Sequence, residues 1–359
     1  MIASIAGRCP WGYGAGAGTP SIGAAIPKSN PAAAKLAQSV DPGLVDITTN
    51  IPYQGASAAG TGIEISANGL VLTNNHVIEG VTSISARDVA TNVVYTAKIV
   101  GYSSSADVAV LQLTNVSGLQ SAPLGNSANV KSGQQVVGVG NAGGVGATPS
   151  YAAGTVVALG RSLSAADPSN PSQMEQLTGM IETNANVLPG DSGGPLVNVK
   201  GKVIGMDTAG SSSGFYGYDR YGSVTAQSYA IAINSALSIA KSIEKGHSSS
   251  FIHVGATAYL GIEVAPSGSI GAGGFDYDTA QSSSGITIAG LVAGSPAASS
   301  ALTVGDVVTS ADGHAVSTIA ALSEYEATMK VGAKVTIGYT NTSGVSATVA
   351  IRLAAGPPQ

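Results

Sequence analysis

The residues best suited to catalysis lie in the segment GDSGGP, residues 190–195, where one serine stands among glycines. Glycines let the backbone turn tightly and bring its amide groups close to a ligand. The amides of Gly190 and Ser192 can then point into one pocket and stabilise an acyl-transfer oxyanion, where one such donor is worth about 10²–10³ in rate. The segment predicts a nucleophilic Ser192, although the same residues also fit a glycine-rich turn with an exposed serine.

A serine hydroxyl is a weak nucleophile unless a base accepts its proton. The chain has four histidines, His76, His247, His253 and His314. The last three lie in a linker, at the start of the second unit and after a turn, which fits surface or structural roles. His76 lies upstream of the serine in the same strand-rich stretch and is the candidate base. An unperturbed histidine titrates near ~6.5, so activity is expected to fall on acidification.

A base of this kind needs a carboxylate to orient it. Asp107 precedes the apolar stretch Val108–Leu113, and a carboxylate at the mouth of a buried strand is costly without a partner. Alone, Asp107 would equally fit a turn or an N-cap. Together, His76, Asp107 and Ser192 supply the base, the carboxylate and the nucleophile that this chemistry requires.

These side chains are positioned by many short strands. The stretch 62–66 alternates apolar and polar residues, Asn68-Gly69 turns, and 70–73 returns, which predicts a β-hairpin. Further strands with turns every 8–12 residues or so favour a barrel or sandwich up to about residue 235. The period then changes to helical over Asn234–Lys245, with Asn234 as a possible cap and residues 247–250 as a hinge-like linker. A second unit follows, with helices expected near 296–301 and 319–329.

The chain order His76, Asp107, Ser192 resembles that of the trypsin-like serine proteases. The sequence is more closely similar to the HtrA/DegP group of these enzymes. The resemblance rests on Leu72–Val77, Asp107–Leu111, Pro189–Leu196 and the run Tyr229–Asn234. It extends from about residue 43 to the C-terminus and is closest to secreted actinobacterial members with one PDZ domain. It implies a mainly β fold, a chymotrypsin-like double antiparallel β-barrel followed by a PDZ domain, which is a β-sandwich with helices.

The resemblance implies roles for the catalytic residues. His76 is expected to be the general base and then the general acid, and Asp107 to hold its tautomer. Ser192 is expected to attack the scissile carbonyl, with the oxyanion hole formed by the amides of the Gly190 to Ser192 turn, Gly190 and Asp191 included. Asp191 itself departs from the asparagine of many HtrA proteins and resembles the digestive trypsin-like enzymes.

The same resemblance implies how substrate is held. Thr208, Ala209 and Gly210 are expected to pair with the substrate backbone, and Asn186 to lie at the base of the primary specificity pocket. Because Asn186 is not an aspartate, we expect a preference for small or medium aliphatic residues over lysine or arginine.

In the second unit, the run Tyr259-Leu260-Gly261-Ile262 resembles the carboxylate-binding loop of a PDZ domain. For these four residues alone an ordinary edge strand is the simpler interpretation. The segments GSPAA (294–298) and VGDVV (304–308) then follow at the spacing of an HtrA-type PDZ domain. The resemblance implies binding of peptide C-termini by strand addition, and the Gly/Ser-rich stretch 266–284 is a departure from it.

The expected organisation has four parts. They are a flexible N-terminal tail (1–42) with a short helix near 32–38, a protease domain (43–235), an interdomain helix and linker (236–257), and a PDZ domain (258–355).

Composition excludes several classes of function. Charged residues are 10% of the 359 residues, against about 25% in an ordinary domain, and the net charge of −5 argues against a nucleic-acid partner. No apolar run approaches the roughly 20 residues that span a bilayer. The single cysteine, Cys9, allows no disulfide within the chain, and no metal or other cofactor is expected. Few charges with much serine and threonine favour a secreted or cell-envelope protein, although residues 1–7 lack the features of a signal peptide.

The leading hypothesis is a serine endopeptidase that acts on unfolded or misfolded proteins, with a PDZ domain that binds peptide C-termini. The expected partners are therefore polypeptides, and the family resemblance makes a homotrimer possible. The alternatives are a non-catalytic scaffold whose PDZ domain is the active part, and a protein that acts chiefly as a chaperone.

Overall fold

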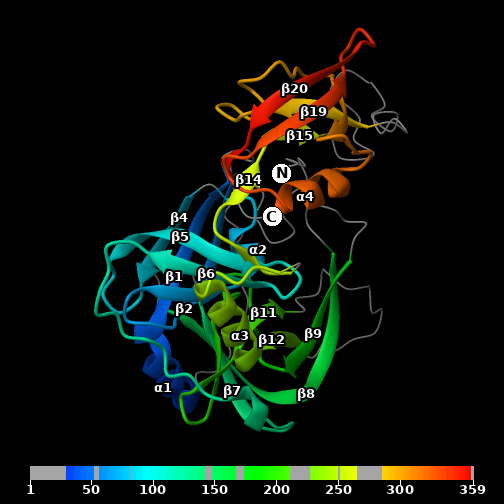
Figure 1. The fold of residues 1–359 in the computed structure, drawn as a ribbon. Coiled ribbons are helices and arrows are strands. Elements are labelled where there is room, and N and C mark those ends of the chain that lie inside the picture. The colour runs from blue at the N-terminus through cyan, green and yellow to red at the C-terminus, as the bar shows by residue number, and fades with distance from the viewer. Residues whose placement is uncertain are drawn as a thin grey trace, which may run out of the picture.

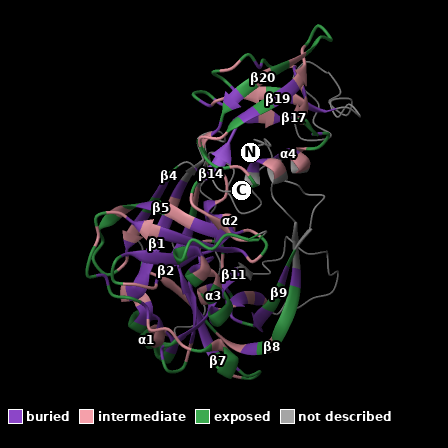
Figure 2. Ribbon diagram, viewed as in Figure 1, coloured by how far each residue is buried: buried purple, intermediate pink, exposed green. Residues whose placement is uncertain are grey.

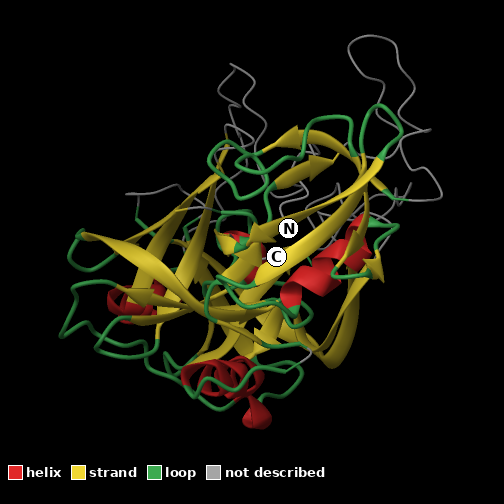
Figure 3. Cartoon of the chain, turned by 45° about the horizontal axis from the view of Figure 1, so that its top comes forward, coloured by secondary structure: helices red, strands yellow, loops and turns green. Residues whose placement is uncertain are grey.

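The computed structural model describes residues 30–51, 56–81, 83–141, 148–166, 174–210, 227–249, 251–264 and 285–356. Within these ranges strands make up most of the ordered structure, and helices are few and short (Figure 3). No helix among the described residues is long and apolar enough to span a membrane.

The first sheet contains seven antiparallel strands in the order β13-β5-β4-β1-β2-β3-β6, and a further β5–β6 pairing closes six of them into a ring. The strands are β1 (Leu44–Ile51), β2 (Ala56–Glu64), β3 (Leu70–Thr73), β4 (Ser83–Asp88), β5 (Val94–Ser103), β6 (Val108–Leu113) and β13 (His253–Val254). The predicted hairpin is confirmed, since β2 and β3 pair with Ile63 opposite Leu72, and Gly69 in the turn has φ +87°.

The second sheet is a closed barrel in the order β10-β11-β12-β9-β8-β7. Its strands are β7 (Gln135–Gly140), β8 (Ser150–Ala166), β9 (Met174–Thr183), β10 (Pro195–Asn198), β11 (Val203–Gly210) and β12 (Ser228–Ala232), with the 3₁₀ turn η3 (Ser127–Asn129) before them. One apolar core includes Leu72 and Val110 of the first sheet and Val139 and Met206 of the second. The predicted pair of antiparallel barrels is therefore confirmed (Figure 1).

The expectation of a flexible tail up to residue 42 is wrong for its last part. Residues Pro31–Val40 form helix α1, capped by Asn30 and followed by the 3₁₀ turn η1 (Asp41–Gly43). Ala33, Ala37 and Val40 share one face of the helix, and all three are buried in the core between the barrels. The predicted helix is thus present and docked, and residues 1–29 lie outside the described residues.

The segment between the two units also differs from a free linker. Helix α3 (Ile233–Glu244) begins after Ala232, so Asn234 does not cap it. Asn234 instead exchanges hydrogen bonds with Asn126 and Ser127. After the helix, β13 pairs with β5, and the ring of His253 stacks on Tyr102 at a centroid distance of 5.0 Å. Residues 253–254 are therefore an edge strand of the first sheet.

The C-terminal unit has its own core and two sheets, of two and six strands. Its strands are β14 (Thr257–Tyr259), β15 (Ile262–Val264), β16 (Ile286–Leu291), β17 (Val307–Ala311), β18 (His314–Ala315), β19 (Lys334–Thr340), β20 (Ser346–Arg352) and β21 (Ala354–Gly356). Helix α4 (Ile319–Ala327) confirms the predicted helix near 319–329, and Leu322 on it is buried with Ile288 and Val335. Figure 2 shows buried stretches along the strands of this unit. The short helix expected at 296–301 is wrong, because these residues form turns and a bend. The Gly/Ser-rich stretch 266–284, which is predicted to depart from the PDZ pattern, lies entirely outside the described residues.

Candidate active site

Asp107 lies in the turn between β5 and β6 with φ +50°, a left-handed conformation that is uncommon for residues other than glycine. Its amide donates to the carbonyl of Ser104, and its own carbonyl accepts the side-chain amide of Asn74 at 3.0 Å. Asn74 is fully buried. These two bonds hold the turn in a conformation that its own dihedral preference opposes.

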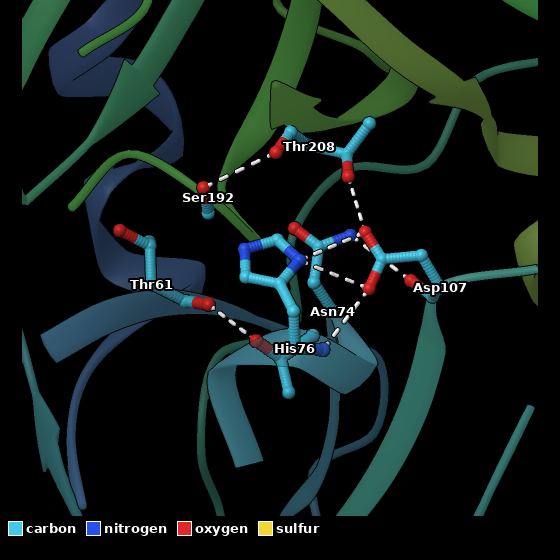
Figure 4. A network of polar contacts seen from close by, with 7 residues as sticks. Thr61, Asn74, His76, Asp107, Ser192 and Thr208 are labelled. Carbon is cyan, nitrogen blue, oxygen red and sulfur yellow. Dashed lines mark hydrogen bonds and ion pairs between the residues drawn. The ribbon is translucent and has the colours of Figure 1, made fainter. Parts of the chain in front are cut away.

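His76 lies in the short helix α2 (Asn75–Ile78), which follows β3. Its ring Nδ1 is 3.0 Å from each carboxylate oxygen of Asp107, and its backbone amide donates to Oδ1 at 3.1 Å. The two side chains are 14% and 7% exposed. A carboxylate on Nδ1 selects the tautomer that carries its proton on Nδ1, so that Nε2 is the nitrogen that can accept a proton. In Figure 4 the other side of the ring faces Ser192.

Thr208 approaches Asp107 from the second barrel. A register shift in the β11–β12 pairing between Asp207 and Ala209 makes Thr208 a bulge residue. Its hydroxyl donates to Oδ2 of Asp107, and its carbonyl accepts the hydroxyl of Ser192 at 3.3 Å (Figure 4). Sequence reasoning assigned Thr208 only a backbone contact with substrate and missed its side chain, because no motif carries that contact.

Ser192 lies in the turn before β10 and is 8% exposed. On either side of it the backbone has positive φ, +100° at Gly190 and +85° at Gly193. A Cβ on Gly193 would come within 2.1 Å of the Thr61 carbonyl, so only glycine fits there. Within the described part of the chain, the amides of Gly190 and Ser192 donate to no backbone carbonyl. Amides of this kind can donate to an oxyanion that forms beside Ser192.

The amide of Asp191 differs from those of Gly190 and Ser192, because it already has a backbone acceptor. That amide donates to the Leu188 carbonyl at 3.0 Å, so the assignment of Asp191 to the oxyanion hole is wrong. Its carboxylate instead accepts the hydroxyl of Ser150 at 2.6 Å and the amide of Leu188 at 2.9 Å. A second carboxyl, that of Asp207, is nearby and fully buried. Burial and the charge of Asp191 raise the pKa of Asp207 well above its usual range.

The expected substrate-binding residues are spread around this centre. Asn186 is exposed, in the segment between β9 and β10. Ala209 and Gly210 continue β11 and pair with Tyr229 and Ser228 on β12. The neighbouring strand on the other side, β10, reaches only to Met206. The edge of β11 beyond Met206 is therefore not paired with β10.

In the C-terminal unit, the predicted loop Tyr259–Ile262 joins β14 to β15. Gly261 has φ +85°, and a Cβ there would lie 2.2 Å from Cβ of Ser295. Its carbonyl accepts the amide of Val292 and the hydroxyl of Ser295, which fixes the turn. Strand β15 is the terminal strand of its sheet and pairs with β16.

Among the residues that the structure describes, no group of three or more His, Cys, Asp and Glu side chains is arranged to hold a metal ion. The geometry brings together the imidazole of His76, the carboxylate of Asp107 and the hydroxyls of Ser192 and Thr208. Such a set is suited to acyl transfer through a serine.

Comparisons with known proteins agree with this chemistry. Residues 60–206 match the family described as trypsin-like peptidase domain, and residues 258–351 match the PDZ domain family. The serine protease PepD of Mycobacterium tuberculosis is 30% identical over 367 residues, which cover 98% of this chain and 73% of PepD. The periplasmic pH-dependent serine endoprotease DegQ of Escherichia coli K12 is 32% identical and is covered over 57% of its length, against 80% of this chain.

The chain spans about half the length of DegQ and of the DegP-like relatives that it matches. A solved structure of the HtrA-type protease AlgW with a tripeptide is 26% identical, with a TM-score of 0.49 over 91% of this chain and 98% of that one.

Proposed function

The chain belongs to the HtrA/DegP family of serine proteases, and on that premise we propose that His76, Asp107 and Ser192 carry out its peptide-bond cleavage. One observation carries the proposal: Nδ1 of His76 is 3.0 Å from both oxygens of Asp107 while the ring lies beside Ser192 (Figure 4). The three residues come from two different barrels, and because Nδ1 of His76 binds Asp107, the ring nitrogen that acts as the base is Nε2.

The reaction follows from these positions. After rotating away from the Thr208 carbonyl, the Ser192 hydroxyl attacks the scissile carbonyl carbon and gives its proton to Nε2 of His76. The amides of Gly190 and Ser192 bind the resulting oxyanion. The intermediate collapses to an acyl-enzyme when the leaving amine takes the proton from His76. Water then attacks the ester, with His76 again as base, and Ser192 is regenerated as the acid product leaves.

The proposed substrates are unfolded or misfolded proteins cut after small or aliphatic residues. The edge of β11 at Ala209 and Gly210 supports this, because an extended substrate strand can pair with it. The preference for aliphatic residues rests on Asn186, which provides no negative charge for a basic side chain.

We propose that the PDZ domain binds peptide C-termini at β15 and the Tyr259–Ile262 loop, since a terminal strand beside a turn with positive φ suits both strand addition and carboxylate capture.

The expected division into a protease domain at 43–235 and a PDZ domain at 258–355 stays a proposal. A homotrimer and a secreted or cell-envelope location are proposals as well. The word periplasmic in the names of DegQ and DegP favours that location.

The test is labelling with a fluorophosphonate probe together with cleavage of an unfolded model protein. Wild type should be labelled at Ser192 and should cut the protein, while Ser192→Ala should do neither. A folded wild type that is not labelled would favour the non-catalytic scaffold. Equal suppression of aggregation by the wild type and by Ser192→Ala would favour a chaperone role, and the mapped cut sites would report the residue preference.

A further inference from the structure

Thr61 on β2 lies at the junction between the two barrels, and its amide, its carbonyl and its hydroxyl all form hydrogen bonds. It is 1% exposed. Its amide donates to the carbonyl of Ser192 at 2.8 Å, and its hydroxyl donates to the carbonyl of Gly190 at 2.8 Å. The same hydroxyl accepts the amide of Asn141 at the end of β7 at 3.0 Å.

Thr61 is itself held in place from the first barrel. Its carbonyl accepts the hydroxyl of Thr73 at 2.7 Å. Thr73 is fully buried at the end of β3, three residues before His76. The position of Thr61 is therefore tied to the strand that also leads to the base.

These bonds fix the orientation of the serine turn. A peptide group is planar, so holding the carbonyl of one residue also orients the amide of the next residue. Thr61 holds the carbonyls of Gly190 and Ser192, while the carbonyl of Asp191 between them accepts the amide of Gly194 at 2.8 Å. Three successive carbonyls of the turn are thus bound within the protein. The bond on the Asp191 carbonyl therefore orients the Ser192 amide, and the two bonds from Thr61 hold the peptide groups on either side of it.

We propose that Thr61 is the positioning residue of the oxyanion turn: its hydroxyl and amide hold the peptide groups on either side of the Ser192 amide, so that this amide faces the developing oxyanion. The inference rests on the proposed function, because it assigns a role within the same acyl-transfer site. Only the hydroxyl can be removed by substitution, and its loss frees the Gly190 carbonyl and the Asn141 amide together.

The test compares Thr61→Val, which replaces the hydroxyl by a methyl, with Thr61→Ser, which keeps it. The matched control is Thr49→Val, because Thr49 is a buried threonine of the same sheet whose hydroxyl donates to the Ala58 carbonyl at 3.3 Å. We expect Thr61→Val to lower kcat on a quenched fluorescent peptide about ten- to hundredfold with little change in KM, a fraction of the loss of a whole oxyanion donor. Binding of a peptide boronic acid, whose tetrahedral adduct mimics the intermediate, should weaken by a similar factor.

Thr61→Ser and Thr49→Val should stay within about threefold of wild type. Thermal unfolding shows whether each variant is folded, and Thr61→Ala replaces Thr61→Val if the added methyl prevents folding. The inference is overturned if the hydroxyl-free variant is folded and keeps its kcat, if KM alone changes, or if Thr61→Ser loses as much as Thr61→Val. A wild type that neither cuts nor is labelled would instead overturn the proposed function, which separates the two failures.

Discussion

The hydroxyl of Thr208 donates a hydrogen bond to Oδ2 of Asp107, and this bond joins the second barrel to the carboxylate that orients His76. Because Oδ2 also lies 3.0 Å from Nδ1 of His76, the carboxylate is held from two sides. The bulge at Thr208 makes this possible, since the same residue presents its carbonyl to the hydroxyl of Ser192.

Replacing this hydroxyl should impair turnover. We expect Thr208→Val to lower kcat about tenfold, because a hydrogen bond to a charged group is worth about 1.5–3 kcal/mol and its loss leaves Asp107 less well oriented. Thr208→Ser keeps the donor and should remain near wild type. Steady-state kinetics on a quenched fluorescent peptide measures both. Equal losses in the two variants would show that the methyl group, not the hydroxyl, matters.

The buried carboxyl of Glu64 should make stability depend on pH. Glu64 is fully buried in β2, and its carboxyl oxygens have no hydrogen-bond partner among the described residues. Burial, with the nearby charge of Asp88, raises the pKa of Glu64 to about 8. Its pKa in the unfolded chain is near 4.5, so the folded state binds the extra proton between these values. Stability should therefore fall as pH rises from about 4.5 to about 8.

Glu64→Gln removes this proton uptake. Its melting temperature should exceed that of wild type by several degrees at pH 8, with the gain shrinking toward pH 4.5. Glu244→Gln, at an exposed glutamate ending α3, is the matched control and should show no such trend. Thermal unfolding across this pH range is the measurement, and a pH-independent difference for Glu64→Gln would contradict the assignment.

The turn of the PDZ domain should tolerate no side chain at Gly261. Gly261 and Gly313 have similar positive φ angles, +85° and +81°, but a Cβ clashes with Ser295 only at Gly261. Gly313→Ala should cost about 1–2 kcal/mol of backbone strain, whereas Gly261→Ala should cost clearly more. Chemical unfolding of the two variants measures the difference. Equal losses would mean that the close approach to Ser295 does not restrict the turn.

Helix α1 should be part of the folded core. Ala37→Asp places an unpaired charge in the apolar core and should lower the melting temperature by at least about 5 °C. Ala32→Asp makes the same change on an exposed position in the first turn of α1, where a negative charge is favourable. The two melting curves test the packing directly, and similar curves would mean that the helix is not docked.

Most of the chemistry could be read from the sequence, because His76, Asp107 and Ser192 lie in short local patterns. The hairpin at Asn68-Gly69 and helix α3 were also predictable, since turn residues and periodicity are local signals. The start of α3 was less certain, because Asn234 bonds with the turn at Asn126 instead of capping its own helix.

The sequence by itself determined which groups can react and which elements carry them. Only the tertiary structure decided how those groups are held. Thr61 contacts Gly190 across 129 residues and Thr208 contacts Asp107 across 101, distances over which no local pattern operates. The docking of α1 and the pairing of residues 253–254 with β5 are also contacts that no local sequence pattern predicts. Each of these contacts forms only when two barrels or two units pack against each other. That packing depends on the burial of a shared apolar core, to which residues from the whole chain contribute.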